Sequence, residues 1–204
     1  MSLMGAMKDR LTELATRGPR ADRPIYLASL ALAHFRGKMG GTRDLDQALS
    51  LSRQADSGGF IPAMNLTAAI LLTPGVDAGP IKDLVSGGII EAYELSLAAA
   101  NKNDPLAMGN IGYLYRTGRG ISLDSFLGAS WTRKAAELPQ TTPRVLNDLG
   151  AIYEEGKAVT PDKAEAQRWY GLAAARGYRM GTNNLSRLRS GHGGTPEILD
   201  GLEY

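Results

Sequence analysis

Residues 149–177, LGAIYEEGKAVTPDKAEAQRWYGLAAARG, repeat residues 111–139 at an offset of 38 positions. Both copies carry an aliphatic residue followed by glycine, then a tyrosine, a turn glycine, an aspartate, a tryptophan and a pair of alanines. A period of this length is typical of stacked supersecondary units, each of which buries its apolar face against its neighbour. The sequence therefore predicts a repeat array, and in such an array function lies on a surface.

The first half of each copy predicts a helix that ends at a glycine. Leu149, Gly150 and Tyr153 fall on one helix face at about 100° per residue. Glycine inside a helix costs about 1 kcal/mol relative to alanine, so Gly150 indicates that a neighbouring helix approaches closely there. We expect this helix to end at Gly156.

The second half of each copy predicts a helix of a different design. Pro161 and Asp162 are typical of a helix N-terminus, where an acidic side chain is favourable. A stripe of alternating small and large residues then allows a partner helix to pack against the indole ring of its tryptophan. The stripe consists of Ala166, Trp169, Ala173 and Ala174, and Gly177 follows as the expected left-handed cap.

The same frame extends along the chain with decreasing similarity. Its leucine position recurs at spacings of 36, 45, 38 and 36 residues, at Leu30, Leu66, Ile111, Leu149 and Leu185. The long spacing predicts a longer loop from Asp77 to Gly88. Amphipathic stripes at 7–15 and 179–190 predict capping helices. We therefore expect an N-terminal cap within residues 1–22, a repeat array at 23–190 and a flexible tail at 191–204.

Composition narrows the classes of function. Across 204 residues, 23 basic side chains nearly balance 21 acidic ones, and the net charge of +2 gives no field that favours nucleic acid. The absence of cysteine excludes disulfides, a thiolate nucleophile and cysteine-ligated metals. No apolar run approaches the roughly 20 residues of a membrane-spanning helix, so we expect a soluble protein without direct membrane insertion.

The start of the chain leaves the compartment open. Met1, Ser2 and Leu3 precede a second methionine, as in chains that carry an expression-vector remnant, and the basic and apolar regions of a secretory signal are absent. The chain as written predicts a cytoplasmic location, and a periplasmic one if a signal sequence has been removed. The oligomeric state is equally open.

On these residues the chain resembles the Sel1-like repeats, which are relatives of tetratricopeptide repeats. Residues 149–177 depart from the pattern only in Ala158, which replaces the second turn glycine, and the likeness covers most of residues 24–190. The resemblance implies an all-α, right-handed α-α superhelix of about four helix pairs with terminal capping helices. It also implies a non-enzymatic adaptor that binds another protein or peptide, in bacterial signalling, secretion or envelope assembly.

The resemblance further implies where a partner binds. Residues two before, two after and five after each leucine position lie opposite the predicted core face of the first helix. In tetratricopeptide repeats that side faces a concave groove, so we expect apolar members to contact a bound peptide and asparagines to bind its backbone. Ordinary packing between repeats is the alternative at each position. The candidates are Phe35, Leu71, Tyr113, Arg116, Asn147, Glu154, Asn183 and Arg187.

We assign no catalytic residue, metal ligand or cofactor. His34 takes the tyrosine slot of a helix, where packing explains it, and His192 lies in a glycine-rich tail without fixed geometry. Two histidines without cysteine supply a transition-metal site poorly. Residues 150–157 resemble a phosphate loop only superficially, because five residues rather than four separate the glycines and the segment lies in a repeat helix.

The periodic aromatic residues are interpreted as core rather than as a platform for bases or sugars. They are Tyr115, Trp131, Tyr153 and Trp169. The alternative function is a cell-wall-related hydrolase or carbohydrate-binding protein. That alternative requires clustered buried ionisable side chains in a closed pocket, whereas a scaffold requires an open surface with mixed apolar and polar side chains.

Overall fold

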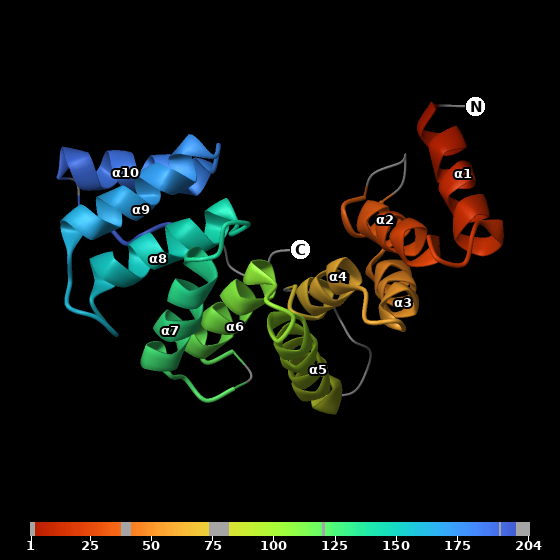
Figure 1. The fold of residues 1–204 in the computed structure, drawn as a ribbon, viewed down its shortest axis with the longest axis horizontal. Coiled ribbons are helices and arrows are strands. Elements are labelled where there is room, and N and C mark those ends of the chain that lie inside the picture. The colour runs from red at the N-terminus through yellow and green to blue at the C-terminus, as the bar shows by residue number, and fades with distance from the viewer. Residues whose placement is uncertain (1–2, 38–41, 74–81, 120, 192, 199–204) are drawn as a thin grey trace. The chain divides into compact units, whose positions relative to one another are not determined.

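The computed structural model describes residues 3–37, 42–73, 82–119, 121–191 and 193–198 (Figure 1). Over these ranges the chain forms ten α-helices and no strand, so the predicted all-α repeat fold is confirmed. Four helix pairs follow one another between a single first helix and a single last one. The helices are α1 (Leu3–Arg17), α2 (Arg23–Phe35), α3 (Leu45–Asp56), α4 (Ile61–Leu71), α5 (Lys82–Ala100), α6 (Pro105–Thr117), α7 (Ser125–Ala136), α8 (Pro143–Glu155), α9 (Lys163–Ala175) and α10 (Arg179–Ser190).

The chain divides into two compact units, residues 1–95 and 96–203. Helices α1 to α4 and most of α5 belong to the first unit, and α6 to α10 belong to the second. The divergent copies of the repeat therefore build the first unit, and the two strict copies lie in the second.

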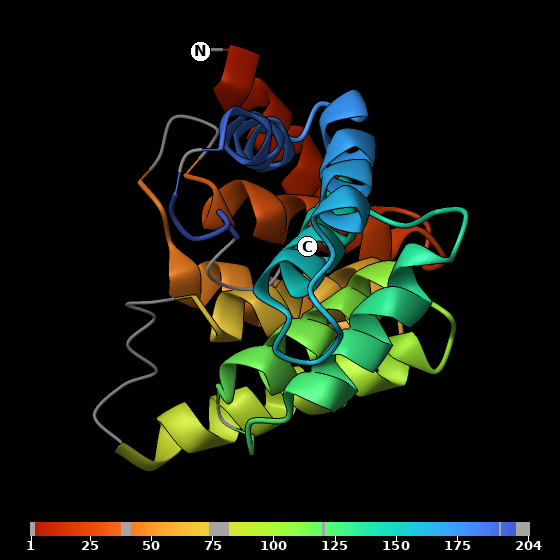
Figure 2. The same cartoon turned by 90° about the vertical axis from the view of Figure 1, so that its left-hand side faces the viewer.

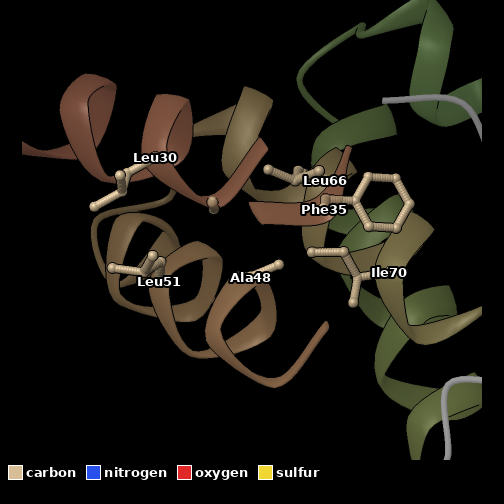
Figure 3. Close-up of a cluster of buried hydrophobic side chains, with 7 residues drawn as sticks. Leu30, Phe35, Ala48, Leu51, Leu66 and Ile70 are labelled. Atoms are coloured by element: carbon tan, nitrogen blue, oxygen red, sulfur yellow. The ribbon is translucent and has the colours of Figure 1, made fainter. Parts of the chain in front are cut away.

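The first unit is built around the leucine positions that the repeat predicts. Leu30 on α2 and Leu66 on α4 are 5% and 3% exposed, and they form one apolar cluster with Phe35, Leu51 and their neighbours (Figure 3). Complete burial of such a side chain is worth about 1.5 to 3 kcal/mol. Leu11 of α1 packs against the same cluster, as expected of a capping helix.

The loop expected from Asp77 to Gly88 is wrong in its second part. Residues 82–88 are the first two turns of α5, and residues 77–81 lie outside the described ranges. A Cβ atom at Gly88 would lie 3.4 Å from Leu71 Cδ2, so α5 passes against α4 at this point. Tertiary packing therefore overrides the low helix propensity of glycine.

The second unit has its helix ends where the repeat predicts them. Gly118 and Gly156 end α6 and α8 with φ of +65° and +66°, in the left-handed region that favours glycine. Asp124 and Asp162 cap α7 and α9, because their carboxylates accept backbone N–H groups of the first turn at 2.9 Å. Such a cap stabilises a helix by about 1 kcal/mol. The paired helices α6 with α7 and α8 with α9 run antiparallel (Figures 1 and 2).

Gly150 marks a close approach between α8 and α9, as predicted. A Cβ atom at this position would lie 2.7 Å from the ring of Tyr170, which is shorter than real Cβ contacts. The missing side chain of Gly150 therefore makes the room that the tyrosine ring fills.

The aromatic residue that α9 buries is Tyr170 rather than Trp169, which corrects the expected stripe. Tyr170 is 0% exposed, whereas Trp169 is half-buried beneath Arg168, whose Cζ lies 4.2 Å from the ring centroid. At about 100° per residue, Tyr170 lies 40° from the buried Ala166 and Trp169 lies 60° from it on the other side. Trp131, Tyr115 and Tyr153 are half-buried too.

Helix length and hydropathy also bear on membranes. Within the part of the chain that the structure describes, no helix has the length and apolar character needed to cross a bilayer.

Candidate functional site

Buried polar side chains occupy the position immediately before the leucine position in four repeats. They are Asn65, Asn110, Asp148 and Asn184, which are 0 to 3% exposed. A buried polar group is costly unless it is hydrogen-bonded, so each of these side chains calls for a partner. Asn110, Asp148 and Asn184 belong to the second unit, where their partners define two connections between repeats.

The first connection joins α6 to α8 through Arg144. This side chain is 1% exposed, and its Nη1 donates to Asn110 Oδ1 at 2.9 Å. Its Nε lies 3.3 Å from Asp148 Oδ2, and its Cζ lies 5.2 Å from the ring centroid of Tyr113. The guanidinium therefore joins an amide, a carboxylate and an aromatic face away from water, which is the kind of environment that its planar donor group suits.

The second connection joins α8 to α10 and takes up the tail of the chain. Asn184 Nδ2 donates to Asn147 Oδ1 at 2.9 Å. The same Nδ2 donates to the carbonyl oxygen of Glu197 at 2.8 Å, and Asn147 Nδ2 donates to that oxygen at 2.9 Å. In return, the Glu197 N–H donates to Asn184 Oδ1 at 2.7 Å. Both backbone groups of one tail residue are thus held by two asparagines.

Charged and polar groups flank the two asparagines. Asn183 Nδ2 donates to the Glu197 carboxylate at 3.0 Å, and Arg187 Nη1 donates to the carbonyl of Gly194 at 3.2 Å. Arg187 Nη2 also lies 2.7 Å from both carboxylate oxygens of Glu154. We name Asn147, Glu154, Asn183, Asn184 and Arg187 the α8–α10 surface.

Tyr170 of α9 is hydrogen-bonded to this surface through Glu154. Its hydroxyl donates to Glu154 Oε2 at 2.8 Å, so Glu154 accepts from α9 and α10 together. Burial raises the pKa of Tyr170, and the hydrogen bond to the Glu154 carboxylate raises it further. The phenol therefore stays protonated and acts as a fixed donor that orients Glu154 toward Arg187.

A pocket of about 190 Å³ adjoins the end of the tail segment. An apolar cavity of about 150 Å³ holds a group of the size of benzene, so this pocket has room for a large aliphatic or aromatic side chain. Its lining mixes apolar, polar and charged residues. They are Arg116, Thr117, Ser125, Ile152, Glu155, Lys157, Ala158 and, from the tail, Ile198.

Four of the eight candidates from the sequence meet on the α8–α10 surface: Asn147, Glu154, Asn183 and Arg187. Arg116 lines the pocket. Leu71 is half-buried at the end of α4 in the first unit.

Phe35 and Tyr113 correct the expectation of exposed groove side chains. Phe35 is 6% exposed within the apolar cluster of the first unit, where Arg43 Cζ lies 4.6 Å from its ring centroid. Tyr113 is 3% exposed and lies under Arg144. The physical reason is that the first helix of a repeat is covered by its own partner and by the next repeat, so its buried face is wider than a single stripe.

The sequence reasoning missed Arg144, Tyr170 and Asn184. A signal for Asn184 was present, because asparagine or aspartate recurs directly before the leucine position in four repeats. The groove frame instead selected the residue two before the leucine, which placed Asn183 in the site and left Asn184 out. Arg144 gave a weaker signal as the one charged residue at a position that is otherwise apolar, namely Ile25, Ile61, Leu106 and Met180.

The chemistry of the described side chains offers little to a metal. Within the described ranges, no group of three or more histidine, aspartate or glutamate side chains is placed to hold an ion. His34 is half-buried and lines an open cleft of about 910 Å³ in the first unit, between α1, α2 and α3.

Comparison with known proteins agrees with the repeat. The Sel1 repeat family matches residues 25–55, 105–139 and 143–178, which together make up half of the chain. These matches coincide with the helix pairs α2–α3, α6–α7 and α8–α9. No curated protein sequence matches the chain.

Two solved bacterial structures are similar to this chain. One is a protective antigen present in uropathogenic Escherichia coli strains that displays an SLR fold, with 27% identity, a TM-score of 0.66 and coverage of 93% of this chain and 37% of that one. The other is a Sel1 repeat protein from Oxalobacter formigenes, with 23% identity, a TM-score of 0.63 and coverage of 83% and 64%. The chain therefore spans less than two thirds of the length of either protein.

Proposed function

Because the chain belongs to the Sel1 repeat family, we propose that it is a non-enzymatic scaffold whose α8–α10 surface binds an extended segment of another protein. Members of this family are generally non-catalytic scaffolds for protein–protein interaction. The setting that we propose is the assembly of bacterial signalling, secretion or envelope complexes. The bacterial origin of both similar structures supports this setting.

The observation that carries the proposal is the pair of asparagines around Glu197. Asn147 and Asn184 bind the N–H and the carbonyl of one residue in an extended segment, and these groups are common to every peptide. Backbone hydrogen bonds of this kind give affinity, and pockets beside them give specificity. The pocket next to Ile198 supplies a place for a side chain.

The buried ionisable groups favour a scaffold over the alternative of a hydrolase. Arg144 and Asp148 are buried, but they pair with each other in the interior and are not part of the pocket lining. Two of the three charged residues that line the pocket, Glu155 and Lys157, form an ion pair at 3.3 Å in which the lysine side chain is 71% exposed. A solvated pair of this kind is a poor setting for acid–base catalysis.

Selection from a random peptide library displayed on phage tests the function and requires no assumption about the identity of the partner. We expect the immobilised full-length protein to enrich a set of related sequences. Asn147→Ala combined with Asn184→Ala removes the backbone contacts and is expected to abolish that enrichment. Arg168→Gln on α9 is the control, because it changes an exposed side chain away from the surface and leaves the enrichment intact. Enrichment of the same sequences by the double variant would contradict the proposal.

A further inference from the structure

The tail of the chain is bound as an extended ligand would be. The side-chain amide of Asn184 makes two hydrogen bonds to a single residue, accepting from the Glu197 N–H at 2.7 Å and donating to its carbonyl at 2.8 Å. A neighbouring β-strand offers the same donor and acceptor to an edge. With the tail in place Asn184 is 0% exposed, and its Nδ2 also donates to Asn147 Oδ1 at 2.9 Å, a contact within the surface that holds the amide in this orientation.

Side-chain contacts select the residue type at this position. The Glu197 carboxylate accepts from Asn183 Nδ2 at 3.0 Å. The residue that follows, Ile198, reaches the 190 Å³ pocket and lines part of its wall. The residue that precedes, Pro196, has no N–H, so an extended backbone passes there without an unpaired donor. The surface thus favours an acidic residue followed by an aliphatic one.

We propose that the partner segment of the α8–α10 surface is an extended peptide in which an acidic residue is followed by an aliphatic one, as in Glu197-Ile198. The tail is an internal copy of that ligand, and the partner displaces it. This inference rests on the proposed function and names the class of partner.

Competition follows from the short connection between tail and surface. Glu197 lies seven residues after Ser190, the last residue of α10. A short link gives an effective concentration on the order of millimolar, so even a weak internal ligand occupies its site. A surface that the tail covers about 90 to 99% of the time binds an external segment about 10- to 100-fold more weakly than a free one.

The experiment uses the full-length protein and a synthetic peptide with the sequence of residues 193–199, GGTPEIL. Glu197→Pro in the protein removes both the N–H that Asn184 accepts and the carboxylate that Asn183 binds. Thr195→Pro is the matched control, since it introduces a proline at an exposed tail position for which no contact with the surface is described. Binding is followed by NMR titration of the asparagine side-chain amides at up to millimolar peptide.

We expect Glu197→Pro to bind the peptide about tenfold or more tightly than the wild-type protein, and Thr195→Pro to resemble wild type. Substituting Gln for the peptide glutamate, or Ser for its isoleucine, is expected to weaken binding to Glu197→Pro. Equal affinity of the wild-type protein and Glu197→Pro would refute the tail as an internal ligand, while the surface would still be a peptide site. Equal binding of the substituted peptides would refute the acidic–aliphatic pattern. No binding to either protein would refute the site itself, and with it the proposed function.

Discussion

Replacing Arg144 with methionine tests whether its buried polar contacts stabilise the second unit. The substitution removes a guanidinium that is 1% exposed and leaves the Asp148 carboxylate, 5% exposed, without its counter-ion. Breaking a buried pair by removing one partner costs about 3 to 5 kcal/mol. Asn110 loses its donor in the same change. Because the free energy of unfolding of a domain is about 5 to 15 kcal/mol, this loss is a large part of the total stability.

The chain itself offers the compensating variant. At the positions of Arg144 and Asp148, the last repeat carries Met180 and Asn184. Arg144→Met combined with Asp148→Asn therefore copies a combination that the repeat already uses. Replacing both partners of a buried ion pair is often neutral. We expect the double variant to recover most of the stability that Arg144→Met loses.

Urea unfolding followed by tryptophan fluorescence measures the free energy of unfolding of the second unit. The chain has two tryptophans, Trp131 and Trp169, and both belong to the second unit. Their signal therefore reports the unit that contains the substitutions. A loss below about 1 kcal/mol for Arg144→Met would refute the burial argument, because that is the range of an exposed pair. A double variant as unstable as the single one would refute the role of the unpaired carboxylate.

Two further predictions concern Tyr170 and its neighbours. Gly150→Ala places a Cβ 2.7 Å from the Tyr170 ring and is expected to destabilise the protein by about 1 to 3 kcal/mol in thermal unfolding. Gly171→Ala is the control, because the space around it is open, and it is expected to be neutral or stabilising. Equal effects of the two substitutions would contradict the close approach. Tyr170→Phe tests the raised pKa: above about pH 10 the unfolded tyrosine loses its proton while the folded one keeps it, so the stability of the wild type falls relative to the variant as pH rises. Urea unfolding at pH 8 and pH 11 checks this, and a constant difference between the two proteins would show that the phenol is not held protonated.

The helix pairs of the second unit were predictable because their signals are local. A glycine at Gly156 and an aspartate at Asp162 fix an end and a start within a few residues of themselves, and the structure has both. Gly150 predicted a close neighbour because glycine has no other advantage within a helix. Each of these residues states its role without reference to the rest of the chain.

The candidate site was harder to predict because its contacts are distant in sequence. Asn147 meets Glu197 across 50 positions, and nothing in the glycine-rich tail indicates where it lies. The choice between Trp169 and Tyr170 failed for a different reason. A helical period of about 3.6 residues places both near the edge of one stripe, and only the space beside Gly150 decides which ring is buried.

The polar contacts between repeats differ from one repeat to the next, so the repeats of the second unit are not interchangeable. Deletion of residues 111–148, one unit of 38 residues, would join Asn110 to Leu149 with the helical frame intact. In that shortened chain Gly109 takes the place of Asn147, so Asn184 loses its acceptor on α8 and the Glu197 carbonyl loses one of its two donors. The two repeats share their apolar residues but differ in their asparagines. A protein that lacks one copy would therefore keep its helical frame and lose contacts to the tail.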